Sequence, residues 1–117
     1  MKNENLRVRT KQFALEIIRF CENLPNDETS KILRRQLLRS GTSVGANYRA
    51  ACRAKSKLDF ISKIGIVAEE ADESGFWIEL LQDAGKVQAK RADPLLQEAN
   101  ELVAISVSSI NTARKNG

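Results

Sequence analysis

Residues 28–54, ETSKILRRQLLRSGTSVGANYRAACRA, decide the fold class of this chain. Apolar and small residues recur in this stretch at alternating spacings of four and three, which is the period of one face of an α-helix. The positions that follow this period are Leu33, Leu37, Ser40, Val44, Asn47 and Ala51. The stripe continues through the unusual centre SGTSVGAN, so the pattern predicts a single helix over the whole stretch.

Two glycines, Gly41 and Gly45, lie four residues apart in the centre of that helix. Each costs roughly 1 kcal/mol of helix propensity relative to alanine. Two explanations are open: a neighbouring helix backbone packs closely here, or the helix bends. A phosphate-binding loop is excluded, because the Gly-Lys-Ser/Thr ending and a preceding strand are both absent.

Helical patterns also precede and follow this stretch. Residues 6–24 are predicted to form a helix that ends before Pro25, and its apolar stripe is Phe13, Ile17, Phe20 and Leu24. Residues 56–84 are predicted to form a helix that begins at Ser56, with Asp59 as the acid of a capping box. Gly85 is well placed to terminate that helix.

A fourth helix is predicted over residues 94–114, with Asp93 as N-cap and Pro94 as its first residue, where a missing amide proton costs nothing. Its predicted apolar stripe is Leu96, Ala99, Val103, Ser106, Ile110 and Ala113. Helix-forming residues dominate the 117-residue chain, and prolines and aromatics are few. The expected fold is therefore all-α, an antiparallel up-down-up-down four-helix bundle forming one domain over residues 1–117.

The charged residues are distributed unevenly along the chain. Residues 31–63 contain nine basic side chains and one acid, whereas residues 64–84 contain six acids and no base. Clustered arginines suit phosphate, and each contact would release condensed counterions. The predicted nucleic-acid ligands are Arg34, Arg35, Arg39, Arg49, Arg53, Lys55 and Lys57. Tyr48 is the one aromatic in this region that could stack on a base.

The basic residues also have a simpler interpretation. A bundle helix keeps a charged outer face, and these arginines can pair with the acids of residues 64–84 in the same subunit or in a neighbouring one. The third predicted helix is apolar on more than one side, which indicates a partner surface and hence a homo-oligomer. The predicted interface residues are Ile66, Glu73, Phe76, Trp77 and Leu80. A core position for Trp77 is the competing interpretation.

The chain lacks the residues that most catalytic and metal sites require. It has no histidine and only two cysteines, Cys21 and Cys52, which excludes the common acid–base and nucleophilic pairs and a tetrahedral zinc site. We therefore expect no enzyme activity, no metal and no cofactor. The N-terminal residues do not resemble a signal peptide and no apolar run is long enough to span a membrane, so a cytoplasmic protein with free thiols is expected.

Residues 43–49, SVGANYR, and 70–81, EADESGFWIELL, resemble the four-helix bundle family of the 23S ribosomal RNA intervening-sequence proteins. This family also includes accessory variability determinants of diversity-generating retroelements, and the similarity covers nearly the whole chain. The resemblance implies a ring-like homopentamer with a basic surface that binds nucleic acid or, in the retroelement branch, a reverse transcriptase. The positions that match the family pattern are Ser43, Asn47, Arg49, Arg53, Glu73 and Trp77.

The chain departs from the family at Ala50, where many relatives carry an acid, so the local face is more basic here. Asn47 falls on the apolar stripe and is expected to satisfy buried polar groups rather than to contact a ligand. The leading function hypothesis is a non-catalytic, oligomeric RNA- or DNA-binding protein. The alternative is an oligomeric scaffold that docks a partner protein such as a reverse transcriptase.

Overall fold

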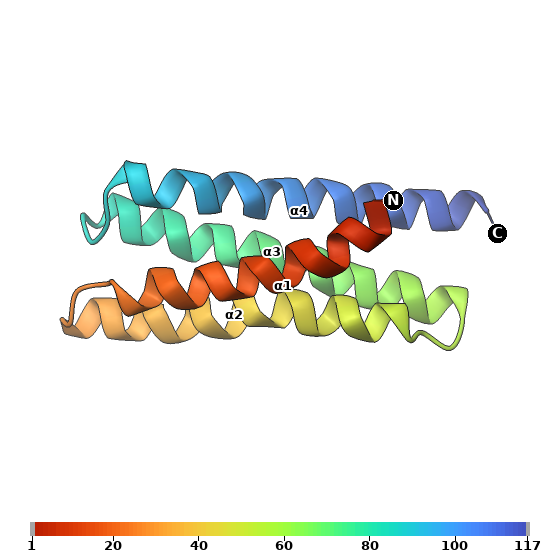
Figure 1. Cartoon of the computed structure of the whole chain (residues 1–117), viewed down its shortest axis with the longest axis horizontal. Coiled ribbons are helices and arrows are strands. Elements are labelled where there is room, and N and C mark those ends of the chain that lie inside the picture. Colours follow the sequence, from red (N-terminus) through yellow and green to blue (C-terminus); the bar gives the residue numbers. More distant parts are fainter. Residues whose placement is uncertain (1, 117) are drawn as a thin grey trace.

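The computed structural model describes residues 2–116, and the side chains from residue 6 onward. Within this range the chain forms four α-helices and no strand, in the order α1 (Lys2–Glu22), α2 (Glu28–Cys52), α3 (Lys57–Asp83) and α4 (Ala89–Lys115). The prediction of an all-α protein with four helices is confirmed, and the helices pack as a bundle. Figure 1 shows the three short connections at alternating ends of the elongated molecule.

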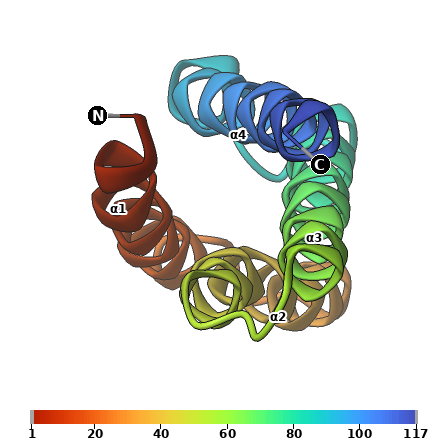
Figure 2. The same ribbon diagram turned by 90° about the vertical axis from the view of Figure 1, so that its right-hand side faces the viewer.

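The packing follows the order of the chain. Each helix packs against the next one along the sequence, whereas α1 and α4 contact each other only sparsely. Figure 2 shows this arrangement from one end, with α1 and α3 on different sides of α2. The Arg9 guanidinium bridges the sparse α1–α4 contact, because it donates to the Glu98 carboxylate at 2.7 and 3.0 Å and to Glu101 at 2.9 Å.

The core confirms the apolar stripe predicted for the first helix, since Phe13, Ile17, Phe20 and Leu24 are all buried. The stripe of α2 is also largely buried: Leu37, Ser40, Val44 and Ala51 lie in the interior, and Leu33 and Asn47 lie at its margin. These stripes bury the apolar area that stabilises the bundle.

The predicted start of the fourth helix was wrong. Helix α4 begins at Ala89 with Gln88 as its N-cap, so Pro94 lies inside the helix and Asp93 does not cap it. Pro94 has no amide proton to donate to the carbonyl of Lys90. Lys90 is an exposed residue in the first turn of α4, so water can donate to that carbonyl instead. The earlier start buries Ala92 completely.

The predicted termini of the third helix were correct. The backbone amide of Asp59 donates to Ser56 Oγ at 3.0 Å, so Ser56 is the N-cap. The Asp59 carboxylate accepts the amide proton of Lys55, at 3.1 Å, instead of that of the cap residue itself. At the other end Gly85 has φ +76°, and Lys86 donates to the Leu81 carbonyl at 2.9 Å in a Schellman motif.

The two central glycines of α2 allow α1 to pack closely. A Cβ atom at Gly41 would lie 2.8 Å from two side-chain carbons of Ile17, and one at Gly45 would lie 3.2 Å from the backbone oxygen of Thr10. Helix α2 is continuous through both positions. Of the two explanations, close packing against a neighbouring helix is therefore confirmed.

The two cysteines differ in accessibility, which gives a first testable prediction. Both are free thiols, but Cys21 is 1% exposed and Cys52 is exposed. Burial raises the pKa of the Cys21 thiol to about 11, which suppresses the reactive thiolate at neutral pH. We expect a thiol reagent to modify one cysteine rapidly in the native protein and two after denaturation. Rapid modification of both in the native protein would contradict this packing of α1 on α2.

Candidate nucleic-acid interface

Six of the seven predicted nucleic-acid ligands are exposed, and only Arg34 is half-buried. Arg35 and Arg49 lie on the outer surface of α2, Arg53 is its C-cap residue, and Lys55 and Lys57 lie at the turn into α3. Among the described residues, none of the three arginine side chains forms a hydrogen bond or ion pair. Guanidinium groups that no carboxylate neutralises are available to an anion from solution.

Arg34 has a structural position instead. Its half-buried guanidinium donates from Nε to the carbonyl of Cys21 at 3.1 Å, and from Nη2 to the carbonyls of Leu24 and Pro25 at 3.3 and 3.0 Å. These carbonyls lie at and just beyond the C-terminal end of α1, where a helix leaves acceptors unsatisfied and its dipole favours a cation. The contacts of Arg34 are therefore with α1.

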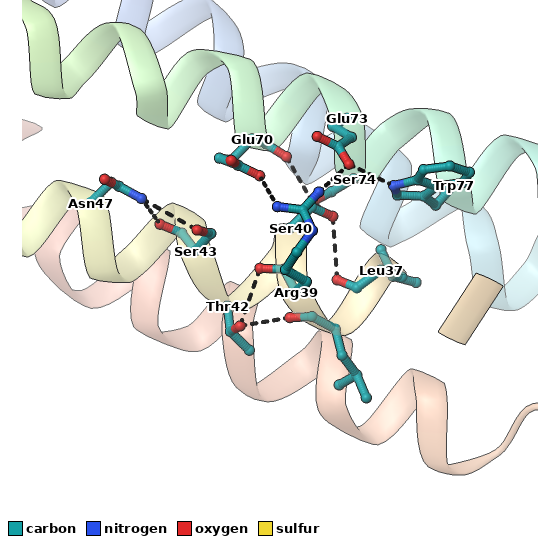
Figure 3. A network of polar contacts seen from close by, with 11 residues as sticks. Leu37, Arg39, Ser40, Thr42, Ser43, Asn47, Glu70, Glu73, Ser74 and Trp77 are labelled. Atoms are coloured by element: carbon teal, nitrogen blue, oxygen red, sulfur yellow. Dashed lines mark hydrogen bonds and ion pairs between the residues drawn. The ribbon is translucent and has the colours of Figure 1, made fainter. Parts of the chain in front are cut away.

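Arg39 also contacts the protein's own chain. Figure 3 shows its guanidinium reaching from α2 to two carboxylates of α3, Glu70 at 3.2 Å and Glu73 at a shorter distance. The hydrogen bond to Glu73 raises the pKa of Arg39 above its ordinary value. The same Glu73 carboxylate accepts the indole proton of Trp77 at 3.1 Å. Pairing with the acids of the third helix is thus observed for Arg39, within one subunit.

A buried polar contact lies beneath this ion pair. Ser74 Oγ of α3 lies 2.9 Å from Ser40 Oγ of α2 and 2.8 Å from the Glu70 carbonyl oxygen, and both serines are fully buried (Figure 3). Asn47 donates from Nδ2 to the Ser43 carbonyl at 2.9 Å. Asn47 is half-buried and bonds within α2, so the groups that it satisfies are only partly buried. Of these contacts, the one between Ser40 and Ser74 joins α2 to α3.

The structure does not support a stacking role for Tyr48. Its side chain is only 4% exposed and lies in the core, so its ring offers no free face to a base. The physical reason is its place on the inner stripe of α2, four residues after Val44 and facing α1. Burial raises the pKa of Tyr48 to about 12.

Two basic residues of α1 were missed by the sequence analysis. Arg7 and Lys11 line a groove between α1 and α2 together with Arg49, Thr42 and Ala46. They lie outside the dense charge cluster of residues 31–63. The signal that could have found them is their spacing of four residues, which places both on the helix edge beside the apolar stripe.

The predicted oligomer-interface residues gather on the outer side of α3. Phe76 is 51% exposed, whereas Ile66, Glu73, Trp77 and Leu80 are half-buried. The rings of Phe76 and Trp77 are in edge-to-face contact with centroids 5.1 Å apart. Trp77 packs partly against the core, so it is not a purely buried residue, and its place in an interface stays a prediction.

The described residues contain no group of three or more His, Cys, Asp or Glu side chains that could hold a metal ion. Nor does any helix in that part of the chain have the length and apolar character needed to cross a membrane. The polar features that the structure does contain are the exposed guanidinium groups of α2, the groove lined by Arg7, Lys11 and Arg49, and the ion pair between α2 and α3.

The fold of the described residues is a small bundle of four helices. Residues 4–108 match the model of the 23S rRNA-intervening sequence protein family, and the chain belongs to that family. A similar solved structure is a protein of unknown function from the S23 ribosomal protein family of Bacteroides thetaiotaomicron. It is 32% identical, with a TM-score of 0.89, over 95% of this chain and 99% of that one. No curated protein matches the chain.

Proposed function

We propose that this protein is a non-catalytic nucleic-acid-binding bundle that acts as a homo-oligomer and holds RNA or DNA on the outer surface of α2. The observation that carries the proposal is the state of Arg35, Arg49 and Arg53. All three are exposed, and none is paired with a carboxylate among the described residues. Such groups bind phosphate with an affinity that does not depend on sequence and falls steeply with salt.

The proposed assembly uses a different side of the molecule. We infer an antiparallel up-down-up-down topology from the alternating connections (Figure 1). Because α1 and α3 lie on different sides of α2, the outer side of α3 faces away from α1 (Figure 2). Exposed Phe76 and its apolar neighbours on α3 favour burial against a second copy. A pentamer is expected from the family resemblance alone. Binding through α2 and assembly through α3 are therefore compatible.

A second candidate function is an oligomeric scaffold that docks a partner protein such as a reverse transcriptase. The observation in its favour is the ion pair of Arg39 with Glu70 and Glu73, because it shows one predicted phosphate ligand neutralised within the chain. Under this alternative, the remaining arginines recognise carboxylates of a protein instead of phosphates.

The test removes the three unpaired arginines of α2 together, as Arg35→Ala, Arg49→Ala and Arg53→Ala in one variant. Thermal stability should barely change, because exposed charges contribute only about 0 to 1 kcal/mol each. Affinity for a fluorescently labelled single-stranded RNA or DNA duplex, measured by anisotropy, should fall. The slope of log affinity against log salt should shrink by roughly 2 to 3, since each lost phosphate contact accounts for about 0.7 to 0.9.

The matched control is a variant with Arg19→Ala, Lys90→Ala and Arg114→Ala, three exposed basic residues on the other helices. It lowers the net charge by the same amount, so it should retain most of the parent's affinity if the surface of α2 is the site. Absence of nucleic-acid binding by the parent at low salt would overturn the proposal and favour the scaffold. Equal losses in both variants would show that overall charge, not this surface, determines binding.

A further inference from the structure

We propose that the groove between α1 and α2 is the site that holds the phosphodiester backbone of the bound strand. This inference rests on the proposed function and assigns its contact point, which includes two residues of α1 that lie outside the basic cluster of the sequence. The site consists of Arg7 and Lys11 on α1 and Arg49 on α2, around a floor of small residues.

The shape of the groove follows from the close approach of the two helices. Because Gly45 has no Cβ, the backbone of α2 can lie against the Thr10 carbonyl of α1. Between the cations the groove is lined by Thr10, Ala14, Thr42, Gly45, Ala46 and Tyr48, and the small residues among them leave the space between the helices open. The result is an open hollow of about 430 Å³ on the molecular surface.

The charged residues that line the groove, among those whose side chains the structure describes, have one sign. Arg7, Lys11 and Arg49 are exposed and line it, and none of its described lining residues is acidic. Within the described part of the chain, none of the three forms an ion pair. Three cations around one hollow repel each other, and an anion placed among them removes that repulsion and gains charge-assisted hydrogen bonds.

The polar groups of the floor add to this preference. The Thr42 hydroxyl donates to the Leu38 carbonyl at 2.6 Å, and the Thr10 hydroxyl donates to the Leu6 carbonyl at 2.7 Å. Their protons are thus used within the helices, and Arg7, Lys11 and Arg49 supply the cationic donors at the groove. A ligand that accepts hydrogen bonds and carries negative charge, as a phosphodiester does, fits this arrangement.

A strand seated in the groove can continue along the same surface. Arg53, the C-cap residue of α2, follows Arg49 by four residues and is exposed, so a neighbouring phosphate of the strand can reach it. The outer side of α3, where assembly is proposed, lies on the other side of α2 from α1 (Figure 2). A bound strand in this groove therefore leaves that surface of α3 free.

The experiment introduces a carboxylate into the groove without removing a cation. Ala46 is exposed in the middle of α2, so Ala46→Glu should leave the helical circular dichroism and the thermal midpoint unchanged. The new carboxylate should pair with a cation of the groove and so remove one charge-assisted hydrogen bond to the strand. Affinity for labelled single-stranded RNA should therefore fall by about tenfold or more, which is what one such bond ordinarily contributes. The matched control is Ala104→Glu, the same change at an exposed alanine of α4, which should bind as the parent does.

A second variant, Arg7→Ala with Lys11→Ala, tests the cations of α1 directly and keeps the inference falsifiable if Ala46→Glu does not fold. It should weaken binding by about tenfold or more and reduce the salt slope by roughly 1.4 to 1.8. If the parent binds and the Arg35, Arg49 and Arg53 variant is weakened, but both groove variants bind as the parent does, the groove is not the site and the proposed function stands. If the parent binds no nucleic acid, both fail.

Discussion

Replacing Gly41 with leucine should lower the free energy of unfolding by about 1 to 2 kcal/mol, although leucine is the better helix former. A Cβ atom at Gly41 would already lie 2.8 Å from Cγ1 and Cγ2 of Ile17. Ile17 is branched at Cβ and completely buried, so it has little freedom to move away. Overpacking costs typically about 1 to 3 kcal/mol and sometimes more, and it should exceed the helix-propensity gain of roughly 0.8 kcal/mol.

The matched control for this prediction is Gly65→Leu in α3. A Cβ atom at Gly65 would meet nothing within 4 Å, so the same substitution should show the propensity gain without the clash. Urea denaturation of both variants should place Gly41→Leu below the parent in stability and Gly65→Leu level with it or above it. If Gly41→Leu is as stable as the parent, the close packing of α1 on α2 does not exist.

The apolar stripe of α1 was predictable because large apolar residues recur in it at spacings of four and three up to Pro25. Phe13, Ile17 and Phe20 are all buried, although the adjacent residues Ala14, Ile18 and Cys21 are also apolar. The glycines were also informative, since two costly residues in one helix indicated either a bend or a close neighbour. Choosing between these needed the position of Ile17.

The buried face of α4 was only partly predictable. Leu95 is followed by Leu96, and Leu102 by Val103, so two apolar lines run one residue apart. The structure buries Leu95 and Leu102 fully, whereas Leu96 and Val103 lie at the edge of the core. A Cβ at Gly75 of α3 would lie 3.5 Å from Leu96 Cδ1. Which line faces inward depends on where α3 lies, and periodicity within α4 does not contain that information.

The candidate site shows the same limitation for charged residues. Arg34 and Arg35 are adjacent in sequence but point about 100° apart on a helix. Arg34 therefore meets the last carbonyls of α1, whereas Arg35 is exposed. Counting basic residues along the chain treats the two as equivalent. It also overlooks Arg7 and Lys11, which join Arg49 only when α1 folds back along α2.

The substitution Phe76→Glu should dissociate the proposed homo-oligomer. Phe76 is 51% exposed on the outer side of α3, where its ring contacts Trp77 edge-to-face. Within one chain the change should cost little, at most the ring contact of about 0.5 to 1.5 kcal/mol. In an assembly joined through this surface, it would bury an unpaired carboxylate, which is strongly destabilising.

Light scattering at micromolar concentration gives the readout. The parent should have a mass several times the 13.0 kDa of one chain, five times if the family resemblance extends to the ring, and Phe76→Glu should approach the mass of one chain. The matched control is Val107→Glu, which changes an apolar residue of similar exposure, 46%, on α4. If the assembly is joined through α3, the control keeps the parent's mass. A parent that is already monomeric would refute the oligomer. If only the Val107→Glu control dissociates, the interface lies on α4 and not on α3.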